Sequence, residues 1–247
     1  MDQQTKAALK QDDRFITTTN HGIEWASENR RSVITTTAIL LGVIVVLVLS
    51  VVIYNKRSDA ASAAFGAAMQ EYQTPLVQAD QPTPPGVKTY PSIAARAKAA
   101  HALFASVADQ YGMTSSGKNA QYFAGLTEIE SGQTQQAEET LKKVAGGWNS
   151  NLAALAKFAL AQLDRDGGHN DQAIAIYQEL MKKPTTTVPA GLAQLQLADV
   201  YQAEGNVAES KKQLADLKDK DAKGPAGMIA AQKLNPTAAG PGGMPPR

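Results

Sequence analysis

The fold is decided by residues 132–144, GQTQQAEETLKKV, whose pattern returns at 168–180 as GHNDQAIAIYQEL and at 205–217 as GNVAESKKQLADL. The turn glycines that open the three segments are 36 and 37 residues apart. A small residue follows each glycine by five positions, a large apolar residue stands four further on, and another apolar residue three beyond that. In order, these are Ala137, Leu141 and Val144; Ala173, Tyr177 and Leu180; and Ser210, Leu214 and Leu217. Because positions i, i+4 and i+7 share one face of an α-helix, each segment predicts a helix with one buried face.

A partner helix is predicted before each of these glycines. Small residues, which let two helices approach closely, stand seven positions upstream at Gly125, Ala161 and Ala198. The pattern of the second helix also occurs once more upstream, as Ala100, Phe104 and Val107. The sequence therefore predicts tandem helix–turn–helix hairpins whose apolar faces are buried by stacking on their neighbours. The alternative is a chance match within an alanine-rich helical bundle.

An uncharged run from Val33 to Ile53 is flanked by Arg30-Arg31 on one side and Lys56-Arg57 on the other. As a helix it would be about 31 Å long at about 1.5 Å per residue, enough to cross the hydrocarbon core of a bilayer. The alternatives are a cleaved secretory signal and a buried core helix. The run is longer than a signal peptide's apolar core, lies more than thirty residues into the chain, and lacks polar periodicity. It predicts a retained single-pass membrane anchor.

The chain divides into four parts around this anchor. We expect a leader at 1–32, the transmembrane helix at 33–54, a helical repeat domain at 55–223 with a proline-rich insertion at 74–91, and a Pro/Gly-rich disordered tail at 224–247. At most a short turn of helix is expected around Met228–Leu234. The leader carries five basic residues against two just beyond the anchor, so the positive-inside bias predicts a cytoplasmic N-terminus and a translocated repeat domain.

The composition argues against catalysis. The formal net charge is +1 and there are no cysteines, which leaves no global attraction to nucleic acid and no thiol chemistry or cysteine-based metal site. The histidines, His21, His101 and His169, have no metal-ligand spacing. No phosphate-binding loop or nucleophile motif is present. We expect no enzyme activity, no cofactor, no metal and no small-molecule substrate.

The spacing of small residue, glycine, alanine and large apolar residue resembles the tetratricopeptide repeat. The resemblance implies an α-solenoid of degenerate tetratricopeptide-like hairpins. The aromatic residue usual early in the first helix is missing, and Gln121, Lys157 and Gln194 stand in its place. The period also exceeds the usual 34 residues by two or three.

The layout of residues 12–217 resembles, by architecture, the YfgM-type ancillary subunit of the SecYEG translocon. That resemblance implies a bacterial inner-membrane protein with a periplasmic repeat domain. It also implies the SecYEG translocon and periplasmic chaperones as partners, with newly exported proteins passed between them. The alternative is a structural scaffold in a bacterial envelope or cell-division complex.

The candidate binding surface is the concave face that the first helices of stacked hairpins line, where peptides or partner helices dock. We expect the polar members Gln162, Arg165 and Asp199 to face the groove, whereas the apolar members could equally belong to the core. The residues predicted for this face are Tyr122, Leu126, Phe158, Gln162, Arg165, Leu195, Asp199 and Gln202.

Overall fold

A computed structural model describes residues 28–77 and 86–236. Its first helix, α2, spans Arg30–Tyr72 and contains the predicted membrane anchor. The apolar side chains from Ile34 to Ile53 are about half exposed or more, and none of the most apolar window of α2 is buried within the chain. Within the described residues, α2 is the one helix long and apolar enough to cross a membrane. The predicted leader lies almost entirely outside those residues.

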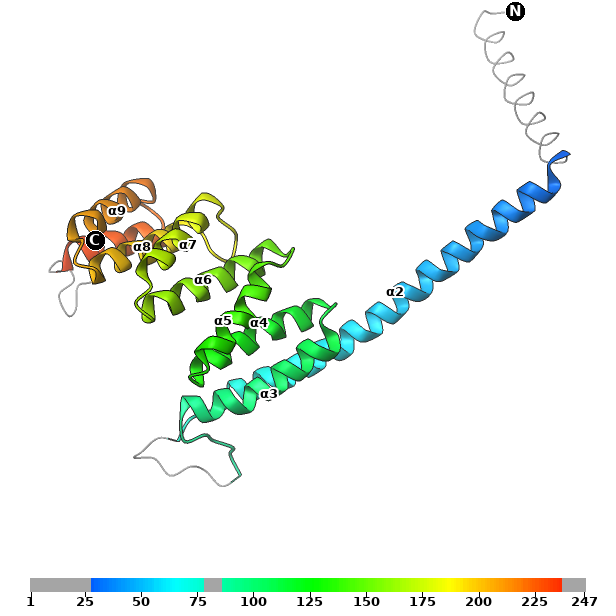
Figure 1. Cartoon of the computed structure of the whole chain (residues 1–247), viewed down its shortest axis with the longest axis horizontal. Helices are drawn as coiled ribbons and strands as arrows, with labels where there is room; N and C mark the ends of the chain where they lie inside the picture. Colours follow the sequence, from blue (N-terminus) through cyan, green and yellow to red (C-terminus); the bar gives the residue numbers. More distant parts are fainter. Residues whose placement is uncertain (1–27, 78–85, 237–247) are drawn as a thin grey trace, which may run out of the picture. The chain divides into compact units, whose positions relative to one another are not determined.

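From Arg57 onward the chain forms a second compact unit made of helical hairpins (Figure 1). We number the hairpins in chain order. The C-terminal part of α2 and α3 form hairpin 1, α4 and α5 hairpin 2, α6 and α7 hairpin 3, and α8 and α9 hairpin 4. The helices after α2 are α3 (Ile93–Tyr111), α4 (Ser115–Glu130), α5 (Thr134–Ala145), α6 (Ser150–Asp166), α7 (Asn170–Lys182), α8 (Ala190–Ala203), α9 (Val207–Lys220) and α10 (Pro225–Leu234). The all-α repeat architecture predicted from the sequence is confirmed.

The turns of hairpins 2 to 4 share one conformation. Gly132, Gly168 and Gly205 have φ values of +81°, +79° and +78°, the left-handed region that side chains disfavour. In each turn the residue after the glycine donates its N–H to the carbonyl five positions earlier, at 2.8 Å, 2.7 Å and 2.8 Å. This bond ends the first helix and starts the return of the chain. The glycine period therefore reflects a repeated backbone requirement.

The helix faces predicted from the repeat are buried. Leu141 and Tyr177 are fully buried, and Leu214 at the third equivalent position is 6% exposed. The close approach predicted at Gly125 is also present, because a Cβ atom there would lie 2.8 Å from both Cγ and Cδ2 of Leu141. Small residues thus set the spacing of the two helices in a hairpin, and large residues fill the space between hairpins.

Hairpin 1 is completed by the part of α2 that follows the apolar segment. Phe65 and Tyr72 of α2 pack on Phe104 of α3 and Phe123 of α4, with neighbouring ring centroids 5.2–6.1 Å apart. The upstream copy of the repeat pattern, around Phe104, thus has the C-terminal part of α2 as the first helix of its hairpin.

Two features differ from or extend the predicted boundaries. The sequence predicts a disordered tail from 224 with at most a short turn, but residues 225–234 form the full helix α10, whose Ala230 is buried against Leu195, Leu214 and Leu217. Burial of that apolar face compensates for the ordering of a segment rich in glycine and proline. In the insertion, Leu76 and Tyr90 form an isolated parallel bridge. The residues at 78–85 and 237–247 lie outside the described part of the chain.

Candidate functional site

The predicted apolar residues of the binding face lie in or against the core. Tyr122 and Leu126 pack on the cluster that contains Leu141. The ring of Phe158 lies 5.7 Å from that of Tyr177, edge to face. Leu195 is only 5% exposed and packs between α8, α9 and α10. Leu195 is therefore a core residue rather than a groove residue, because α10 covers the end of the stack.

The predicted polar residues are closer to solvent, and two of them, Arg165 and Asp199, form hydrogen bonds with other helices of the chain. Arg165 of α6 donates through Nη1 to Oε1 of Gln196 on α8 at 3.1 Å, and it pairs with its neighbour Asp166 at 2.9 Å. Asp199 accepts a hydrogen bond from Lys233 of α10 at 2.6 Å. These bonds join hairpin 3 to hairpin 4 and hairpin 4 to α10.

Gln162 and Gln202 complete the predicted polar set. Gln162 is half-buried and Gln202 is exposed, and neither side chain makes a hydrogen bond within the described residues. A partner that docks on the first-helix face would find these two amides free. It would have to compete with internal bonds at Arg165 and Asp199.

A second surface follows from the missing aromatic residues. The structure has a cavity beside each position where the repeat usually carries a large ring. The cavity beside Gln121 measures about 210 Å³, the cavity beside Lys157 about 200 Å³, and the cavity beside Gln194 about 530 Å³. Because a flexible polar side chain fills less volume than an aromatic ring, the substitution leaves space between the two helices of each hairpin.

The three cavities are equivalent sites of successive repeats. Val144, Leu180 and Leu217 line them in turn, and these residues are separated by 36 and 37 positions, the period of the turn glycines. Each cavity is lined by the start of the first helix and the end of the second helix of its hairpin. The sequence pattern identified the missing rings, but only the packed structure shows that they leave a row of cavities.

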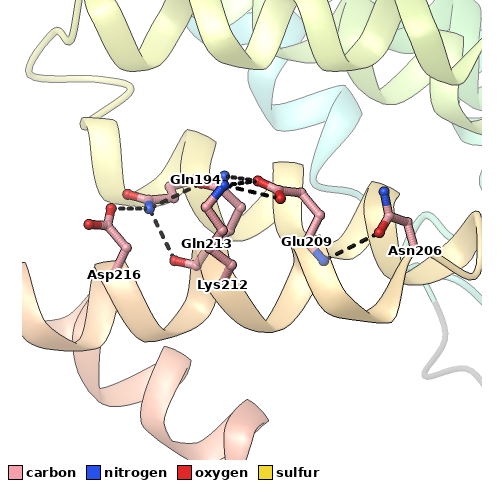
Figure 2. Close-up of polar contacts among 6 residues, drawn as sticks. All are labelled: Gln194, Asn206, Glu209, Lys212, Gln213 and Asp216. Carbon is pink, nitrogen blue, oxygen red and sulfur yellow. Dashed lines mark hydrogen bonds and ion pairs between the residues drawn. The ribbon is translucent and has the colours of Figure 1, made fainter.

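A carboxylate accompanies the polar residue in hairpins 3 and 4. Lys157 donates to Oε1 of Glu179 at 2.6 Å. Gln194 is 5% exposed and donates to Oδ2 of Asp216 at 2.9 Å and to the backbone carbonyl of Gln213 at 3.0 Å (Figure 2). The hydrogen bond from Lys157 holds the pKa of Glu179 below its usual value. Both pairs tie the first helix of a hairpin to its second helix.

The acid of hairpin 4 is stabilised mainly from its own helix. Lys220 donates to Asp216 at 2.9 Å and is the main cause of the lowered pKa of that carboxyl, with Gln194 the next contribution. Figure 2 shows the rest of this polar row along α9, in which Gln213 donates to Glu209 at 2.9 Å. The buried amide of Gln194 thus donates to Asp216 and Gln213, and Gln213 is itself held by Glu209.

The described residues contain no group of three or more His, Cys, Asp or Glu side chains placed to hold a metal ion. His101 is partly buried beside Glu128, with Nε2 3.8 Å from Oε1. His169 is exposed in the turn of hairpin 3, with its Nδ1 3.9 Å from Oδ1 of Asp164. Both surfaces offer hydrogen-bonding, charged and apolar groups to a partner.

A family model for a tetratricopeptide repeat-like domain matches residues 24–178, more than half of the chain. The chain belongs to this family. The matched residues of the tetratricopeptide repeat-like protein include all of α2, hairpin 2 and most of hairpin 3, together with α3 of hairpin 1. Hairpin 4 and α10 lie beyond them, and the geometry of the Gly205 turn identifies hairpin 4 as a further repeat.

Two crystal structures share the fold of this tetratricopeptide repeat-like chain. Both are of a provisionally assigned kinesin light chain from Podosopora anserina with nearly identical TPR-like repeats, and one of the two carries a single substitution. Each has a TM-score of 0.53, with 17% identity for the substituted form and 18% for the other, and the alignment covers 72% of this chain and 84% of that chain. At this identity the likeness shows the fold alone. No curated protein matches the chain.

Proposed function

We propose that this protein is a non-enzymatic, membrane-tethered protein–protein interaction module of the bacterial inner membrane. Its repeat domain lies in the periplasm and works as an accessory of the Sec translocon, linking exported proteins to periplasmic chaperones. The observation that carries the proposal is α2, which runs without a break from the exposed apolar segment into hairpin 1. A recognition surface joined in this way to a membrane helix stays next to the membrane.

The direction of insertion rests on the basic residues. Five lie in the leader and two just after the apolar segment, which favours a cytoplasmic N-terminus. The placement beside the translocon rests on the resemblance in layout to YfgM-type subunits. The role in handing on other proteins rests on the repeat fold, which presents extended surfaces for peptides and helices.

The proposal is tested by photo-crosslinking in living cells. A photoreactive amino acid replaces Gln162 or Gln202, whose side chains make no hydrogen bond within residues 28–77 and 86–236, so that the stack is left intact. The same probe at Lys211, an exposed residue of the second helix of hairpin 4, serves as the matched control. We expect translocon subunits or periplasmic folding factors in the adducts from Gln162 and Gln202, and not from Lys211.

Two results would contradict the proposal. Adducts made only of cell-division or cell-wall proteins would favour the scaffold alternative. Protection of the repeat domain from protease added to intact spheroplasts, with digestion only after the spheroplasts are lysed, would place the domain on the cytoplasmic side of the membrane.

A further inference from the structure

The three equivalent cavities differ in charge, and hairpin 2 is the exception. In hairpins 3 and 4 the second helix supplies an acid, Glu179 or Asp216, to the polar residue of the first helix. In hairpin 2 the position 36 residues before Glu179 is Lys143, while Gln121 occupies the position equivalent to Lys157. The chain therefore places a carboxylate at this site twice and a cation once.

The site in hairpin 2 is left open by this difference. Within the described residues, the side chains of Gln121 and Lys143 make no hydrogen bond or ion pair. None of the nine residues that line their cavity is acidic, and one further lysine, Lys118, lies at its wall. Lys142, which precedes Lys143 in α5, is already paired with Glu138 at 2.5 Å. Within the described residues, Lys118 and Lys143 thus form no ion pair with a carboxylate, and the amide of Gln121 beside them makes no hydrogen bond.

An exposed aromatic residue borders the same cavity. Trp148 is 83% exposed, and Nζ of Lys118 lies 4.3 Å from the centroid of its ring. Tryptophan is enriched in protein interfaces because its ring offers a large, rigid apolar surface. The cation over the ring holds Trp148 beside the cavity. The site therefore combines two lysines and an amide with an apolar platform.

We propose that the cavity of hairpin 2 recognises a Glu or Asp side chain of a partner protein, with an adjacent apolar residue of that partner packed on Trp148. The carboxylate takes the place that Glu179 and Asp216 occupy in hairpins 3 and 4. It accepts from Lys143, Lys118 and Gln121, while the cavity of about 210 Å³ holds the side chain that carries it. This inference rests on the proposed function as a protein-interaction module and names the chemistry of the segment that it binds.

Trp148 itself reports binding. The chain has two tryptophans, so Trp25→Phe leaves Trp148 as the sole tryptophan emitter in the purified full-length protein in detergent. The probe is an end-blocked peptide containing Glu-Glu-Leu-Leu, and its matched control is the same peptide with Gln-Gln-Leu-Leu. We expect a saturable change in Trp148 fluorescence with the Glu peptide and about tenfold weaker binding of the Gln peptide, because hydrogen bonds to a charged group are the stronger kind.

The decisive variant is Lys143→Glu, which supplies the acid that hairpins 3 and 4 already have. Lys143 is exposed, so the substitution leaves the core unchanged. We expect the Glu peptide to bind at least about tenfold more weakly to this variant. Lys211→Glu on α9 makes the same change in net charge far along the chain and should bind like the parent protein.

Three outcomes would overturn the inference: equal binding of the two peptides, unchanged binding to the Lys143→Glu variant, or complete competition by millimolar inorganic phosphate, which would indicate a general anion site. None of these bears on the crosslinks made in cells from Gln162 and Gln202. The failure of this site and the failure of the proposed function are therefore separate results.

Discussion

Gly125 packs closely against Leu141, so the effect of Gly125→Ala on the unfolding free energy should depend on the side chain at position 141. Substituting Gly125→Ala places a methyl group 2.8 Å from Cγ and Cδ2 of Leu141, a fully buried side chain that must shift to accommodate it. Contact of this kind in a filled core costs about 1–3 kcal/mol. Replacing a glycine inside a helix by alanine contributes about 1 kcal/mol in the opposite direction. The single variant should therefore lose about 1 kcal/mol of unfolding free energy.

The effect of Gly125→Ala on the unfolding free energy should change sign when Leu141 is replaced by alanine. Leu141→Ala alone should cost about 2–5 kcal/mol, because it removes a buried side chain and leaves a cavity. In that background the methyl group of Gly125→Ala keeps only an ordinary contact with Cγ2 of Thr140 at 3.5 Å, so the helix contribution of about 1 kcal/mol dominates and the substitution stabilises. The two substitutions should then couple by about 1–3 kcal/mol.

The cycle is measured by urea unfolding of the full-length protein in detergent, followed by circular dichroism at 222 nm. The matched control is Gly66→Ala, a helical glycine whose added Cβ would meet no atom within 4 Å. That variant should stabilise by about 1 kcal/mol whether or not Leu141 is present. Coupling below about 0.5 kcal/mol between Gly125→Ala and Leu141→Ala would refute the argument that Gly125 is required by the approach of α5.

Three further predictions concern a turn and two tyrosines. Gly168→Ala should destabilise by about 1–2 kcal/mol in the same urea assay, because φ is +79°, whereas Gly167→Ala, with φ of −83°, should have little effect. In the described part of the chain the buried hydroxyl of Tyr177 has no hydrogen-bond partner, so Tyr177→Phe should raise the unfolding midpoint by the equivalent of about 1 kcal/mol; a lower midpoint would contradict this expectation. Burial and the hydrogen bond to Glu130 raise the pKa of Tyr72 to about 12. Since an unfolded tyrosine has a pKa near about 10, this contribution to stability is complete below that pH and is lost as the pH rises toward 12. Absorbance at 295 nm should show a late phenolate step that is reduced in Tyr72→Phe, and an undiminished step would contradict the assignment.

The candidate site could be predicted only in part. The spacing of the repeat located the first helices, and Arg165 and Asp199 do lie near solvent on them. The sequence predicts at most a short helical turn around Met228–Leu234, so it could not show that Lys233 of α10 binds Asp199. For Leu195 the sequence left a core position and a groove position equally open, because its burial depends on contacts with α9 and α10 that only the packed structure shows. The cavities escape prediction because a missing ring becomes empty space only when two helices are packed around it.

The sequence by itself determined the helical hairpins, the left-handed turns at Gly132, Gly168 and Gly205, and the apolar run of α2. Each of these follows from local rules, namely a helical period, a backbone angle that only glycine adopts freely, and a length of apolar chain. The tertiary structure alone decided that the C-terminal part of α2 packs on α3 and α4, that α10 covers Leu195, and that Glu179 and Asp216 bind Lys157 and Gln194 across their hairpins. Those features depend on which side chains meet across helices, and the partner of a side chain is set by packing between segments rather than by its own neighbours along the chain.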